Sequence, residues 1–153
     1  SAYALFAGNE ALACKTVEAA KSARIDAQIK PDGSMPRELA RTRSWHYTLY
    51  NLEAFFTLAA IGERLGIDLA NYESRGGGSI RKALDFVAPY ADHKKKWSYE
   101  QIAETNEYNL AKFLHNAALI YNDRRYDELR AKLKIEDADS ARYHLLPVRA
   151  LSP

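Results

Sequence analysis

Four side chains suited to binding and proton transfer recur at helical spacing in one segment. Arg43, Tyr47 and Tyr50 are three or four residues apart, and His46 lies one turn from both Arg43 and Tyr50. Solvated helix faces favour Lys, Glu and Gln, whereas this face offers Arg, His and two Tyr. The pattern indicates either a functional site or a structural layer of hydrogen-bonded side chains.

The chemistry open to these side chains is proton transfer beside a bound carboxylate. A guanidinium favours the phenolate, so it lowers the pKa of a nearby tyrosine from its reference value of about 10. Such a tyrosine can act as a general base and then as a general acid, and arginine pairs bidentately with a carboxylate. β-Elimination from a uronic acid needs these steps: the carboxylate is neutralised, a base removes the proton on the adjacent ring carbon, and an acid protonates the departing glycosidic oxygen.

A second candidate group lies in the loop predicted at residues 91–98. Lys95 and Lys96 could grip an acidic polymer while Trp97 stacks on a sugar. The alternative is a basic surface loop with Trp97 packed into the core. The sequence alone leaves both interpretations open.

The elements that must position these groups read as helices. A helix of about 41–65 carries the Arg, His and Tyr side chains, and Gly66 is placed to end it. Its opposite face has the apolar stripe of a core-facing helix. The members of that stripe are Trp45, Leu49, Leu52, Phe56 and Ala59.

The rest of the chain also predicts helices and no strand. Asn9 and Ser79 are placed as helix caps, and Pro36 marks an irregular lead-in at 34–41. Paired antiparallel helices predict an all-α fold, either an α/α barrel or toroid or a plain helical bundle. The other expected helices are 9–29, 80–88, 99 or 102 to 121, and 124–133, and the opening residues 2–6 also look helical. Turns or loops are expected at 30–33, 67–78 and 91–98, and an irregular tail is expected from 135.

Length and composition limit the possible partners. The 153 residues fit one domain spanning 1–153. A net charge of +2 is too small to indicate a nucleic-acid partner. Basic clusters at Arg37, Arg41 and Arg43 and at residues 94–96 could attract an acidic polymer, or they are solvated patches. No apolar run approaches the ~20 residues of a membrane span, so no membrane partner is predicted.

The sequence predicts neither a metal nor a cofactor. The single cysteine, Cys14, excludes an internal disulfide and a Cys-rich metal site, and it reads as a small buried residue. No pair of His or carboxylate side chains has convincing metal-ligand spacing.

Two runs of the sequence resemble the alginate lyase family. Residues 32–47 read Asp-Gly-Ser-x-Pro-x-Glu-x-x-Arg-Thr-Arg-Ser-x-x-Tyr, a long and specific string, and residues 82–90 read Lys-Ala-Leu-Asp-Phe-Val-Ala-Pro-Tyr ahead of Trp97. The likeness covers about residues 2–120. It implies a partial α/α toroid, here a C-terminal part of a catalytic domain, with a cleft for an acidic polysaccharide such as polymannuronate, and it implies a secreted or periplasmic location.

The resemblance also implies roles for particular residues. The catalytic tyrosine of the family matches Tyr47, and an arginine shortly before it holds the substrate or tunes the tyrosine. Arg41 and Arg43 are both candidates, and helical spacing favours Arg43. His46, Tyr50 and the residues of the 95–97 loop are the expected substrate contacts.

One departure from the family pattern bears on activity. The family also uses an Asn-Asn-His motif, which this chain lacks and which is expected just before a segment like residues 2–12. The missing N-terminal part of the same protein is therefore an expected partner. A non-catalytic acidic-carbohydrate-binding fragment is the alternative function. A glycoside hydrolase is disfavoured, because it needs paired carboxylates, and near Tyr47 only Glu38 and Glu53 are available.

Overall fold

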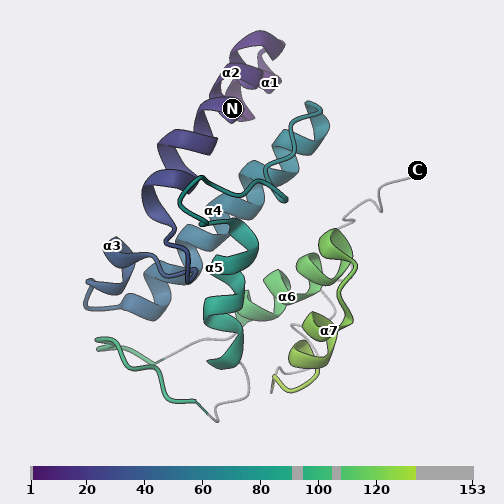
Figure 1. Cartoon of the computed structure of the whole chain (residues 1–153). Helices are drawn as coiled ribbons and strands as arrows, with labels where there is room; N and C mark the ends of the chain where they lie inside the picture. The colour runs from purple at the N-terminus through teal and green to yellow at the C-terminus, as the bar shows by residue number, and fades with distance from the viewer. Residues whose placement is uncertain (1, 91–94, 105–107, 134–153) are drawn as a thin grey trace.

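The computed structural model is an assembly of helices without a sheet (Figure 1). It describes residues 2–90, 95–104 and 108–133. Within these residues the only β contacts are two isolated bridges, so the predicted all-α class is confirmed. The helices are α1 (Ala2–Phe6), α2 (Glu10–Ala20), the π-helical η1 (Lys21–Asp26), α3 (Pro36–Leu39), α4 (Ser44–Arg64), α5 (Ile80–Val87), the 3-10 turn η2 (Ala88–Tyr90), α6 (Tyr108–Tyr121) and α7 (Arg124–Arg130).

Both predicted cap residues begin their helices as expected. The Leu12 N–H donates to Asn9 Oδ1 at 3.0 Å, and the Lys82 N–H donates to Ser79 Oγ at 3.2 Å. These bonds satisfy backbone donors that have no partner within the helix. After α2 the chain continues helically through η1, so the predicted extent to about residue 29 holds, with wider π-type turns from Lys21.

Helix α4 is the centre of the fold. It contacts α2, α5 and α6, and Figure 1 shows α2 and α4 side by side, running in opposite directions. The predicted core stripe of α4 is confirmed, because all five of its members are buried. They join one hydrophobic cluster that also takes in residues from α2, η1, α5, α6 and α7. The core therefore fixes the rotation of α4, and with it the face that carries Tyr47.

Two predicted helix starts and one predicted irregular segment were wrong. Helix α4 begins at Ser44, not near residue 41, and the lead-in expected to be irregular contains the short helix α3 with Pro36 in its first turn. Residues 99–104 are not helical, and α6 begins only at Tyr108. The α4 and α6 boundaries share one physical reason: residues 42–44 and 100–102 hydrogen-bond to one another across the chain. That pairing keeps Thr42, Arg43 and residues 100–102 outside the helices.

The remaining expectations concern the end of α4, the single cysteine, membrane-spanning helices and the C-terminal tail. Gly66 follows α4 in a left-handed conformation, with φ +70°, as a C-terminal cap requires. Cys14 is only half-buried against the core. No helix among the described residues is long and apolar enough to cross a membrane. Lys94 and the tail predicted from residue 135 lie outside the described residues.

Candidate active site

Tyr47 and Arg41 form a stacked pair at the N-terminal end of α4. The Arg41 guanidinium carbon lies 4.0 Å from the centroid of the Tyr47 ring. Tyr47 is half-buried, and Arg41 is exposed. A guanidinium over an aromatic face stabilises the pair by about 0.5–1 kcal/mol at an exposed site. The contact places a cation over one face of the phenol, and the exposed Arg41 side chain remains accessible to a ligand.

Arg43 occupies a different position from the one helical spacing predicted. It is the residue before the first turn of α4, with φ −120° and ψ 54°, and its side chain makes no capping bond. The Tyr47 N–H donates to the Arg43 carbonyl oxygen at 3.0 Å. The Arg43 side chain is exposed. Backbone geometry therefore ties Arg43 to Tyr47, while the guanidinium over the ring comes from Arg41.

His46 and Tyr50 lie on the exposed side of the same helix. The His46 ring meets the Tyr47 ring edge-on, with centroids 5.9 Å apart. Tyr50 is 67% exposed, so its ring is available for stacking. Of the predicted site residues, His46 and Arg41 have side chains in contact with the Tyr47 ring, whereas Tyr50 shares only the exposed side of the helix.

A non-helical strap, residues 97–102, crosses the first turn of α4. Glu100 carbonyl oxygen accepts bonds from the Ser44 N–H at 3.1 Å and the Ser44 hydroxyl at 2.6 Å. The Ile102 N–H donates to the Thr42 carbonyl oxygen at 3.0 Å. The strap therefore sets the direction in which the chain enters α4.

Trp97 anchors the strap in an aromatic cluster. Its Nε1–H donates to Ser44 Oγ at 2.7 Å, and its ring centroid lies 5.0 Å from that of Trp45 and 4.8 Å from that of Tyr90. Phe86 and Tyr99 complete the cluster. Trp97 is half-buried, so only its exposed part is open to a sugar.

The two predicted lysines lead into this cluster. Lys95 Nζ lies 4.8 Å from the centroid of the Tyr90 ring, and Lys96 is exposed. Because Tyr90 also packs on Trp97, Lys95 is linked through two aromatic rings to the start of α4.

The Asp-Gly-Ser turn before α3 packs on α5. Gly33 has φ +83°, and a Cβ added there would collide with the Lys82 carbonyl oxygen. The Ser34 N–H donates to Asp32 Oδ1 at 2.9 Å. Hydrogen bonds from the side chain and backbone of Ser34 lower the pKa of Asp32 below its usual value. This part of the family-like string is therefore structural: it fixes the lead-in that carries Arg41.

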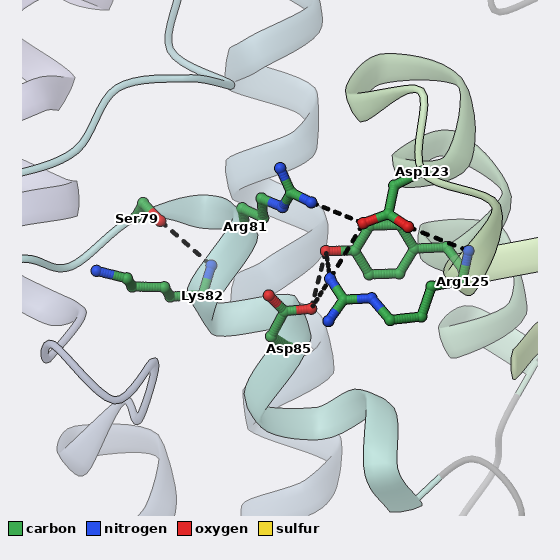
Figure 2. Close-up of polar contacts among 7 residues, drawn as sticks. Ser79, Arg81, Lys82, Asp85, Asp123 and Arg125 are labelled. Atoms are coloured by element: carbon green, nitrogen blue, oxygen red, sulfur yellow. Dashed lines mark hydrogen bonds and ion pairs between the residues drawn. The ribbon is translucent and has the colours of Figure 1, made fainter.

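A second polar cluster joins α5 to α7 (Figure 2). The Tyr126 hydroxyl donates to Asp85 Oδ1 at 2.8 Å, and the Arg125 guanidinium lies between Asp85 (3.3 Å) and Asp123 (3.1 Å). Arg81 pairs with Asp123 at 2.7 Å. Burial, followed by the bond to Asp85, raises the pKa of Tyr126 to about 12. A fully buried ring with a raised pKa suits a structural clamp and not a proton donor open to substrate.

The described part of the chain offers no group of three or more His, Cys, Asp or Glu side chains that could hold a metal ion. Sequence reasoning missed the strap and the α5–α7 clamp. Both depend on bonds between residues about 40 to 56 positions apart, and patterns of neighbouring residues do not predict such bonds.

Comparison with known proteins agrees with the family-like strings. The family model described as alginate lyase matches residues 1–97. A crystal structure of an alginate lyase from Bacteroides ovatus is 36% identical, with a TM-score of 0.83, over 90% of this chain and 37% of that one. No curated protein matches. The chain thus spans well under half of that neighbour, and its helices form the predicted partial α/α toroid. This chain belongs to the alginate lyase family.

Proposed function

We propose that this chain is part of a polysaccharide lyase that cleaves an acidic polyuronate, such as polymannuronate, by β-elimination. Tyr47 takes the proton from the ring carbon that bears the carboxylate. The C–O bond to the leaving sugar breaks as the ring double bond forms, and the tyrosine returns its proton to the departing oxygen. The observation that carries the proposal is the Arg41 guanidinium stacked 4.0 Å from the Tyr47 ring within the family-like string.

Arg41 and Arg43 have different roles in neutralising the substrate carboxylate. Arg41 holds the phenol through its face, and its N–H groups at the edge are free to pair with a substrate carboxylate. Arg43 is exposed one turn before Tyr47 and supplies a second cation. Neutralising the carboxylate makes the neighbouring ring proton more acidic, which is the electrostatic requirement of the reaction.

Binding along the polymer falls to the exposed groups around this pair. His46 and Tyr50 extend the site along α4, and Lys95 and Lys96 add positive charge beside the strap. The exposed part of Trp97 offers an apolar face to a sugar. These groups suit a polymer that carries one carboxylate per unit.

The rest of the catalytic set has to come from outside this chain. No Asn-Asn-His motif occurs in the 153 residues, and the Bacteroides ovatus structure continues well beyond the matched part. We therefore propose that a further part of the same protein supplies the Asn and His beside Tyr47. By the family resemblance we also propose a secreted or periplasmic location.

A carbohydrate-binding role is the second candidate. Arg41, Arg43, Lys95 and Lys96 are all exposed, so they can hold an acidic polymer without any chemistry. The absent Asn-Asn-His motif favours this role for the chain on its own.

One assay separates the possibilities. The protein as its gene encodes it and the 153-residue chain are each incubated with polymannuronate, while ultraviolet absorbance, reducing ends and polymer binding are followed. We expect absorbance from the unsaturated product with the gene-encoded protein, and binding without absorbance from the isolated chain. Reducing ends without absorbance would identify a hydrolase and overturn the proposal.

A further inference from the structure

The N-terminus of α4 is capped by Gln101, a residue 56 positions further along the chain than the N–H it binds. Arg43 occupies the N-cap position but makes no side-chain bond to the helix. The Trp45 N–H, one of the donors that an N-cap normally satisfies, instead donates to Gln101 Oε1 at 3.1 Å. Gln101 is half-buried, and its own Nε2 donates to the Ala103 carbonyl oxygen at 2.8 Å. Both ends of the amide are therefore held.

The same contact fixes the backbone that carries the arginines. Arg43 and Gln101 form an isolated antiparallel bridge, and the Ile102 N–H donates to the Thr42 carbonyl oxygen at 3.0 Å. Thr42 and Arg43 follow Arg41 directly, before the helix begins. The Arg41 N–H bonds the Glu38 carbonyl oxygen at 3.1 Å, at the end of α3, and the strap holds the two residues that join Arg41 to α4. The placement of the Arg41 guanidinium over Tyr47 then depends on the strap.

We propose that Gln101 is a positioning residue for the Arg41–Tyr47 pair. Its Oε1 replaces the missing N-cap side chain and keeps residues 41–43 in the path that stacks Arg41 on the phenol. It acts through the backbone and does not contact the substrate. The inference rests on the proposed function for its effect on turnover, but its effect on the ring pair can be measured without turnover.

The test compares two replacements of similar size. Gln101→Met removes the acceptor, whereas Gln101→Glu keeps an acceptor for the Trp45 N–H and removes the donor to Ala103. With 3-fluorotyrosine at position 47, we expect Gln101→Met to move the fluorine resonance toward its position in an Arg41→Ala protein. In the gene-encoded protein we expect kcat to fall on the order of tenfold with KM changed less than about twofold. In the Gln101→Glu protein we expect the fluorine resonance and kcat to stay close to their values in the parent protein.

Gln28→Met is the matched control. Gln28 is also half-buried and also bonds α4, since its Oε1 accepts from Asn51 Nδ2 at 2.9 Å, but that bond lies one turn beyond Tyr47 and away from the start of the helix. It should leave the resonance and kcat unchanged.

Two results would overturn the inference: a Gln101→Met resonance equal to that of the parent protein, or a Gln101→Glu protein as perturbed as Gln101→Met. Should Gln101→Met not fold, Gln101→Leu, which also removes the acceptor, takes its place in the comparison. Absence of lyase activity in the parent protein would count against the proposed function only, because the fluorine resonance still tests the inference.

Discussion

Removing the Tyr126 hydroxyl should weaken the clamp between α5 and α7 in a pH-dependent way. The ring is fully buried, and its hydroxyl donates to Asp85 Oδ1 at 2.8 Å. A hydrogen bond to a charged acceptor contributes about 1.5–3 kcal/mol. Because the Asp85 side chain is 36% exposed and also meets Arg125, water and Arg125 replace part of the lost bond in Tyr126→Phe. We therefore expect Tyr126→Phe to lower the free energy of unfolding at pH 8 by about 1.5 kcal/mol, the low end of that range.

The alkaline range gives the sharper test. Burial and the bond to Asp85 raise the pKa of Tyr126 to about 12 in the folded protein, against about 10 when it is unfolded. A raised folded pKa means that the stabilisation is complete below pH ~10 and is lost as the pH rises toward ~12. Between these values each pH unit removes about 1.4 kcal/mol. The wild-type protein should then lose about 1.4 kcal/mol of this contribution by pH ~11, and Tyr126→Phe should be about equally stable there.

Urea unfolding followed by circular dichroism at both pH values measures these differences. Tyr3→Phe is the control, because Tyr3 is 91% exposed and its replacement should change the stability little. A gap between wild type and Tyr126→Phe that is the same at pH 8 and pH 11 would refute the reasoning.

Two further predictions concern stability. Thr48→Val should stabilise the protein by about 1 kcal/mol in urea unfolding, because Thr48 Oγ1 is buried and has no hydrogen-bond partner among the described residues; a clear loss would show that the hydroxyl is bonded. Gly33→Ala should cost more than 2 kcal/mol, since its Cβ would collide with the Lys82 carbonyl oxygen, whereas Gly66→Ala, also at positive φ but in open space, should cost about 1 kcal/mol. Thermal melts compare the two, and equal costs would contradict the packing argument.

Local patterns predicted the parts of the fold that local physics determines. The stripe from Trp45 to Ala59 follows the helical period, so its burial could be read from the residues. Asn9 and Ser79 act within their own first turns, and both caps were predictable for that reason.

The start of α4 and the partner of Tyr47 could not be predicted in this way. A helical wheel treats residues 41–43 as helix and so favoured Arg43, but bonds to residues 100–102 pull them out of the helix. Arg41 then reaches the ring from a non-helical segment. The non-helical conformation of residues 99–102 has the same origin, since their partners lie more than 50 residues away.

The most direct test of the central claim is the turnover of Tyr47→Phe in the gene-encoded protein. This change removes one oxygen and should leave the ring under Arg41, so the fold should persist by circular dichroism. We expect lyase turnover of polymannuronate to fall by at least about 10²-fold, the usual contribution of a proton-transferring side chain, with Tyr72→Phe as an active control. A Tyr47→Phe protein that forms the unsaturated product at a near-normal rate would contradict the assignment of Tyr47.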